Sequence, residues 1–73
     1  MITATKLGLA IKSYREYNEW KQFEVADAVQ VSYGYYSYLE AGKRMPSVPV
    51  LILLVGVFEI ELSELIAHAE EMK

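Results

Sequence analysis

The side chains best suited to bind another molecule lie between Ser32 and Arg44. Read as a helix, this stretch places Tyr35, Tyr36 and Leu39 on one apolar stripe that must face a core. The opposite face then carries hydroxyl groups and rings, and a basic pair follows the glycine that can end the helix. Hydroxyl groups bind a partner by hydrogen bonds, aromatic rings by van der Waals contact, and basic side chains by charge. The predicted outward residues are Tyr33, Gly34, Ser37, Tyr38 and Ala41, with Lys43 and Arg44 beyond them.

Catalysis and metal binding find little support in the sequence. There is no cysteine, His68 is the only histidine, and no glycine-rich loop precedes a helix where it could hold phosphate. No nucleophile has a base at a recognisable spacing. We therefore predict neither an enzyme nor a metal site or cofactor. The 73 residues form one predicted domain, residues 1–73, near the size where a single core is only just sufficient.

The net charge of −3 is unevenly distributed. Residues 1–44 hold six Lys and Arg against five Asp and Glu, whereas residues 45–73 hold one Lys against five Glu. The acidity therefore lies away from the predicted binding face. The apolar run at residues 48–58 is about half the roughly 20 residues of a membrane span, and the start lacks a signal-peptide pattern. We expect a cytoplasmic protein without membrane contact.

Apolar periodicity predicts an all-α domain of short helices. Thr5 is the expected cap of the first helix, and Ser32 and Ser47 are the expected caps of the third and fourth. The second and third helices are joined so tightly, at residues 29–32, that they have the spacing of a helix-turn-helix unit. The five predicted helices span about residues 6–17, 22–29, 33–41, 48–58 and 62–71.

The fourth predicted helix is apolar on nearly all sides, although a helix that packs against a core on one side needs only one apolar face. Two interpretations stay open for its extra apolar face: deeper core, or an interface with a second copy. The residues expected at such a dimer interface are Ile52, Leu53, Gly56 and Ile60.

Short elements keep one register over most of the chain, from about Leu7 to Ile66. They include Leu7-Gly8, Arg15-Glu16, Gln22, Ala26, Val31-Ser32, Leu39-Glu40, Gly42-Lys43-Arg44, Pro46-Ser47 and Leu62-Ser63-Glu64-Leu65. Together they resemble the lambda-repressor-like family of helix-turn-helix DNA-binding domains, also called the Cro/cI or XRE type. The resemblance implies a five-helix regulator, a repressor or controller, whose third helix enters the major groove of double-stranded DNA. It also implies a homodimer on a palindromic operator, and association with the nucleoid when bound.

The resemblance assigns roles by position. Tyr33, Gly34 and Tyr38 stand where bases are usually read, and Gln22 would touch phosphate or steady the third helix. It also pairs Arg15 with Glu40, as a structural ion pair. The DNA-contacting residues that it implies are Lys21, Gln22, Ser32, Tyr33, Gly34, Ser37, Tyr38, Lys43 and Arg44.

The sequence departs from the family pattern at two places. Gln30 replaces the glycine usual in the turn, at a cost of about 1–2 kcal/mol for a left-handed non-glycine residue. Tyrosines replace the usual amide and basic side chains, and a tyrosine can contact a phosphate, a thymine methyl or a single acceptor. A tyrosine-rich face also suits protein binding. The alternative is a protein-interaction module that binds a repressor, polymerase or toxin through the third helix, or through the fourth and fifth.

Overall fold

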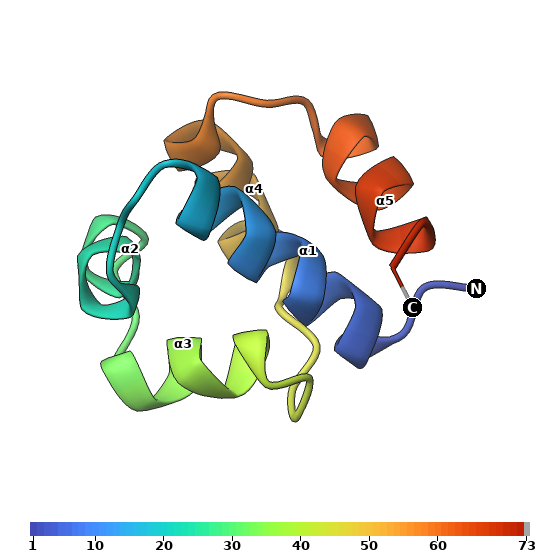
Figure 1. Cartoon of the computed structure of the whole chain (residues 1–73). Helices are drawn as coiled ribbons and strands as arrows, with labels where there is room; N and C mark the ends of the chain where they lie inside the picture. The colour runs from blue at the N-terminus through green and yellow to red at the C-terminus, as the bar shows by residue number, and fades with distance from the viewer. Residues whose placement is uncertain (73) are drawn as a thin grey trace.

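The computed structural model describes residues 1–72, which form helices joined by short turns and contain no strand. The helices are α1 (Ala4–Tyr17), α2 (Gln22–Ala28), α3 (Tyr33–Glu40), α4 (Val48–Phe58) and α5 (Leu62–Glu70). They surround α1, with α5 lying alongside it and α3 crossing its other side (Figure 1). The N-terminal segment lies beside the end of α5. The all-α, five-helix class predicted from the sequence is confirmed.

The first helix begins two residues earlier than predicted, and the expected cap at Thr5 is wrong. Thr3 is the last residue with extended backbone, and its Oγ1 accepts a hydrogen bond from the Lys6 N–H at 3.1 Å. Thr5 therefore lies inside the helix. Helices α2, α3 and α5 each end one residue before their predicted limits, because the next residue is already the C-cap: Val29, Ala41 and Glu71.

Local side-chain chemistry fixes the other helix ends. Ser32 and Ser47 cap α3 and α4 as expected, each Oγ accepting from the N–H three residues later. Gln30 has the left-handed backbone that its place in the turn requires, with φ 63°. Gly42 follows α3 with φ 76°, a conformation that glycine adopts without a steric penalty. The left-handed backbone at Gln30 and at Gly42 therefore defines the turns before and after α3.

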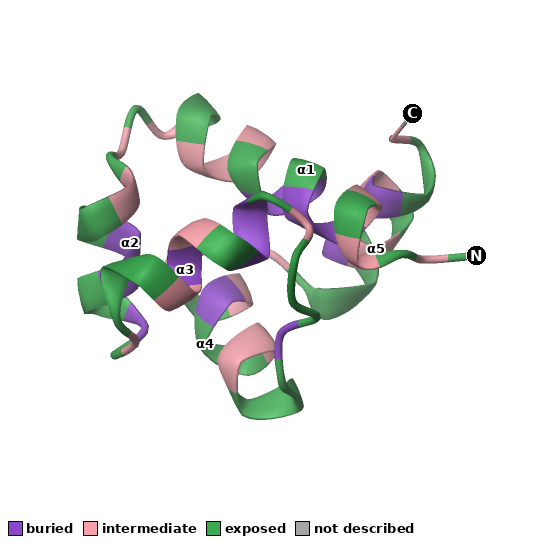
Figure 2. Cartoon of the chain, turned by 90° about the horizontal axis from the view of Figure 1, so that it is seen from below, coloured by how far each residue is buried: buried purple, intermediate pink, exposed green. Residues whose placement is uncertain are grey.

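All five helices contribute to one core, and the buried segments turn toward the centre of the molecule (Figure 2). Trp20, in the turn after α1, anchors that turn to the core, since its ring stacks on Phe58 with centroids 6.1 Å apart. Tyr14 stacks on the same ring at 5.7 Å. The buried apolar side chains are Leu7, Ala10, Ile11, Val25, Ala26, Val29, Tyr36, Leu39, Leu54, Phe58, Leu65 and Ala69.

The Glu40 carboxylate, buried at the end of α3, joins three helices. Arg15 of α1 donates to both of its oxygens, from Nε at 2.6 Å and from Nη2 at 3.1 Å. Gln22 at the start of α2 donates through Nε2 at 2.9 Å, and the Tyr36 hydroxyl donates at 2.6 Å. A carboxylate has about four lone-pair sites, so this one is fully used. Arg15 also donates through Nη1 to the Trp20 carbonyl at 2.8 Å.

These hydrogen bonds decide the charge of the group. Burial alone would raise the pKa of Glu40, but the bonds from Arg15, Tyr36 and Gln22 outweigh it and hold that pKa below its ordinary value of 4.5. Burial, with the bond to the carboxylate, raises the pKa of Tyr36, so its hydroxyl stays a donor. Glu40 is therefore ionised at neutral pH and paired with a charged guanidinium.

Gly8 allows α1 to approach the end of α3. A Cβ at this position would overlap the Leu39 carbonyl oxygen and lie 2.7 Å from that of Glu40. Both atoms belong to the backbone, so a larger side chain would force the helices apart. The absent side chain therefore places Arg15 and Glu40 within hydrogen-bonding range.

We predict that Glu40→Gln destabilises the fold by about 3 kcal/mol at pH 7, because the partly buried Arg15 guanidinium loses its buried counter-charge. The folded pKa of Glu40 lies below 4.5, so its stabilisation is complete above that pH and is lost as the pH falls through the folded pKa. The variant should therefore lose less stability than the wild type on acidification. Denaturant unfolding at several pH values measures both effects. Glu16→Gln, an exposed acid on α1, is the control, and equal losses for the two variants would contradict the account.

The same substitution should have opposite effects at two helical glycines. Gly8→Ala should cost about 1–3 kcal/mol through backbone overlap. Gly34→Ala should stabilise α3 by about 0.5–1 kcal/mol, since a Cβ there meets nothing within 4 Å. Thermal melting of both variants checks the pair, and a stabilised Gly8→Ala protein would refute the close approach of α1 and α3.

Candidate nucleic-acid interface

The outer face of α3 is a continuous exposed surface. Tyr33 is 58% exposed and Tyr38 is 52% exposed, although both are large aromatic side chains. Tyr36 and Leu39 on the opposite face are fully buried, as the apolar stripe predicted. The inner face of α3 packs against α1 and α2. The Tyr33 and Tyr38 rings on its outer face are therefore accessible to an external partner.

A hollow opens between α3 and the segment that follows it. Its lining is formed by Tyr33, Gly34, Tyr35, Ser37, Tyr38 and Arg44. Five of these are sequence-predicted binding residues, and Tyr35, expected on the stripe that faces the core, is partly buried against the core and also lines the hollow. Gly34 leaves open space on this face, because a Cβ there would meet no atom within 4 Å. The structure thus brings the tyrosines, the glycine and one cation of the predicted set together.

Positive charge flanks this surface. Lys43 lies over the Tyr38 ring, with Nζ 5.5 Å from the ring centroid, in a cation–π contact. Lys21, Lys43 and Arg44 are all exposed. Among residues 1–72 the contacts within 4.0 Å between a basic and an acidic side chain are those of Arg15 with Glu40 and of His68 with Glu71. The three exposed cations therefore keep charges that an anionic ligand can neutralise.

Gln22 and the predicted ion pair lie apart from that surface. The Gln22 amide is directed to Glu40, so it steadies α3 from within. Arg15 and Glu40 are in contact at 2.6 Å. Sequence reasoning missed the Tyr36 hydroxyl as a partner of Glu40, although their spacing of four residues on one helix was the available signal.

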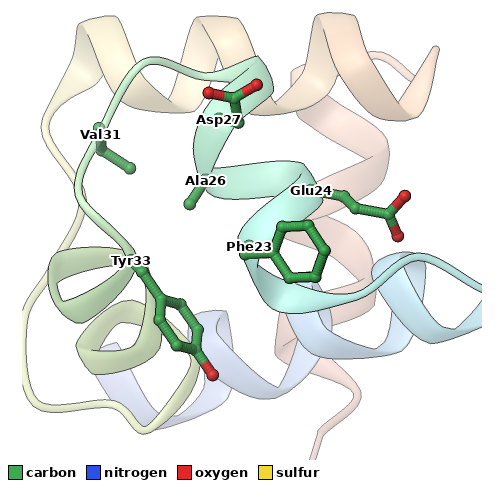
Figure 3. A pocket seen from close by; sticks show the side chains of 6 residues that line it. All are labelled: Phe23, Glu24, Ala26, Asp27, Val31 and Tyr33. Carbon is green, nitrogen blue, oxygen red and sulfur yellow. The ribbon is translucent and has the colours of Figure 1, made fainter.

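A second hollow lies on the other side of Tyr33, between α2 and the turn. Val31 and Ala26 face its interior, the rings of Phe23 and Tyr33 stand at one end, and the Asp27 carboxylate stands at the other (Figure 3). Glu24 completes the rim. The sequence analysis did not single out this hollow. The Glu24 and Asp27 carboxylates at its rim would repel phosphate. A DNA-binding surface on α3 would therefore not extend into this hollow.

Helix α4 exposes one of its apolar faces. Ile52 is 59% exposed and Leu53 is 42% exposed, and Gly56 has open space around it. The buried side of the helix is formed by Leu54 and Phe58. Ile60, also expected at an interface, is partly buried against the core and adds less to the exposed face than predicted. The extra apolar surface of α4 is therefore not deeper core.

Known proteins share both the sequence pattern and the arrangement of helices. The helix-turn-helix family model matches residues 11–65, three quarters of the chain. The chain belongs to the helix-turn-helix family. It is a DNA-binding transcriptional regulator of the XRE type, as the sequence elements predicted. Helices α2 and α3 are the helix-turn-helix unit. The exposed rings of Tyr33 and Tyr38, here called the tyrosine face, lie on the outer side of α3, its second helix.

Solved structures of similar proteins extend the comparison. Two structures of the clp gene regulator ClgR from Corynebacterium glutamicum are 28% identical, with TM-scores of 0.88 and 0.85, and each covers 92% of this chain. The matched regions are 71% and 87% of those chains. The restriction-modification controller protein C.AhdI from Aeromonas hydrophila shares the fold, with 24% identity and a TM-score of 0.81 over 85% of this chain and 94% of its own. No curated protein matches the chain.

Other kinds of site receive no support from the described residues. Within residues 1–72 no group of three or more His, Asp or Glu side chains could hold a metal ion. None of the helices in that range is long and apolar enough to cross a membrane.

Proposed function

We propose that the protein binds a palindromic operator as a homodimer, with α3 in the major groove, and represses or controls transcription from the adjacent promoter. The observation that carries the proposal is the exposed tyrosine face of α3, bordered by exposed cations, in a helix-turn-helix chain. The clp gene regulator ClgR, at 28% identity, supports a role in gene regulation.

Affinity and specificity would come from different residues. Lys21, Lys43 and Arg44 would neutralise phosphates on either side of the groove, a contribution that does not depend on sequence. Tyr33 and Tyr38 would touch base edges, where each hydroxyl makes a single hydrogen bond rather than a two-pronged one. Ser32 already accepts from the Tyr35 N–H, so its hydroxyl proton remains for a phosphate oxygen.

The homodimer would form through the exposed face of α4. Val48, Ile52 and Gly56 repeat every four residues and so line one side of the helix, with Leu53 beside them. An apolar patch of this kind on a small domain marks an interaction site. Gly56, with no atom near its absent Cβ, would let the backbones of two α4 helices approach closely. A two-fold axis there would present two copies of α3 to successive major grooves.

An alternative is a protein-interaction module, and the hollow in Figure 3 favours it. Phe23, Val31 and Tyr33 offer apolar contact, and Glu24 and Asp27 would attract a basic partner segment. Chromatography on immobilised duplex DNA at low salt distinguishes the two functions. A DNA-binding regulator is retained on the column, whereas an interaction module passes through.

Replacing Arg44 with Ala should weaken binding to every duplex by a similar factor, since the side chain would contact phosphate rather than a base. Because one phosphate would no longer be neutralised, the slope of log affinity against log salt should become shallower by about 1. Fluorescence anisotropy across a salt series, on one specific and one random duplex, measures both quantities. Lys12→Ala, an exposed lysine on α1, is the control.

Tyr38→Ala should differ from Arg44→Ala by changing which sequence binds best. A loss of equal size on the specific and the random duplex would contradict base contact by this tyrosine. Retention of the random duplex unchanged by Arg44→Ala would argue against the phosphate contact.

Placing a charge on the exposed face of α4 should separate the dimer without unfolding the domain. Sedimentation equilibrium of Ile52→Glu should give a mass near 8.3 kDa, where the wild type gives twice that value. Burying an unpaired carboxylate in an apolar interface costs several kcal/mol, whereas in the free protomer Ile52 is 59% exposed. Tyr17→Glu on α1 is the matched control and should stay dimeric. A wild type that remains monomeric, or an Ile52→Glu protein that remains dimeric, would refute this interface.

A further inference from the structure

The four glycines of the chain fall into two groups. Gly8 is required inside the domain because a Cβ would overlap the backbone of α3, and Gly42 is required because its φ is 76°. Gly34 and Gly56 have no such reason: a Cβ at either position meets nothing within 4 Å, and neither has positive φ. Both weaken the helices that contain them. Both lie on the exposed faces that the proposed function uses, so their missing side chains leave room for something outside the protomer.

The space at Gly34 has an aromatic and hydroxyl border. Tyr33 precedes it, and Ser37 and Tyr38 follow at three and four residues, the spacings that share one face of a helix. Lys43 covers the far border, with its Nζ over the Tyr38 ring. The result is an open, shallow hollow in which an apolar group can reach the helix backbone at Gly34, between the two tyrosine rings.

The same face lacks the side chains that read hydrogen-bonding edges. From Tyr33 to Glu40 there is no Arg, Lys, Asn or Gln, so α3 itself can make no bidentate contact with guanine or adenine. Single hydrogen bonds from hydroxyl groups discriminate bases less well, and the apolar base feature in the major groove is the C5 methyl of thymine. An aromatic border around backbone that is left open at Gly34 suits contact with this apolar group.

Resting on the proposed function, we propose that α3 selects DNA by the C5 methyl groups of pyrimidines, one of which enters the space over Gly34 between Tyr33 and Tyr38. In unmodified DNA the methyl group belongs to thymine. In methylated DNA the same group on 5-methylcytosine presents the same chemistry, and the experiment separates these two sources.

The test compares duplexes that differ only in that methyl group. A duplex enriched from a random pool at about 50 mM salt is remade with each thymine replaced in turn by uracil, which keeps all hydrogen-bonding groups. At one position in each half-site, the replacement should weaken binding about fourfold, the effect of one buried methyl. Uracil between or outside the half-sites should change little. Cytosine and 5-methylcytosine at the sensitive position form a second pair that differs only in the methyl group, and 5-methylcytosine should bind more tightly than cytosine if the methyl is read.

The variants identify where the methyl enters. Gly34→Ala fills the space without an internal clash, so it should fold and should bind thymine and uracil duplexes equally. Tyr33→Phe keeps the ring and should keep the thymine preference, whereas Tyr38→Ala should reduce it. Tyr17→Ala, an exposed tyrosine on α1, should leave the ratio of the two affinities unchanged.

The outcomes distinguish this inference from the function on which it rests. Specific binding of the wild type with equal affinity for thymine and uracil at every position would overturn methyl reading and leave the DNA-binding function intact. A full thymine preference in Gly34→Ala would overturn the site at Gly34. A wild type that retains no duplex would overturn both the proposed function and the inference.

Discussion

The position of α3 depends on one carboxylate. Glu40 receives hydrogen bonds from α1, from the start of α2 and from α3 itself, and no side-chain nitrogen or oxygen buried in residues 1–72 is left without a partner. An ion pair of this kind adds little net stability compared with apolar packing, but breaking it is costly. Its main effect is therefore on geometry. With Gly8 permitting the close approach of α1, the network fixes the orientation of α3 and leaves its outer face free.

A domain of this size has little core to spare, yet each of its five helices exposes at least one large apolar or aromatic side chain. Tyr33 and Tyr38 on α3, and Ile52 on α4, are each more than half exposed. Two such surfaces on one small protein are explained if each has an external partner, DNA for α3 and a second copy for α4. The charge distribution agrees with this division, since Lys43 and Arg44 follow α3 directly, while residues 45–73 hold five Glu against one Lys.

Much of the fold was predictable because it depends on local chemistry. Apolar periodicity located the helices, and Ser32 and Ser47 were correct caps because a serine hydroxyl needs only the N–H three residues on. The contact of Arg15 with Glu40 was expected through the family resemblance rather than from spacing. Features that join distant segments were missed, such as the Tyr36 bond to Glu40 and the hollow around Val31. The cap at Thr5 failed for another reason, since Thr3 offers the same chemistry two residues earlier.

The most direct test of the account is to sequence the duplexes that the purified protein retains from a random pool. The account predicts an inverted repeat whose half-sites lie about one helical turn, roughly 10 base pairs, apart, because a two-fold dimer would present α3 twice. It also predicts that the enriched half-site contains thymine at a fixed position. Retained duplexes with no shared motif, or a motif without two-fold symmetry, would contradict the claim that this protein reads an operator as a homodimer through α3.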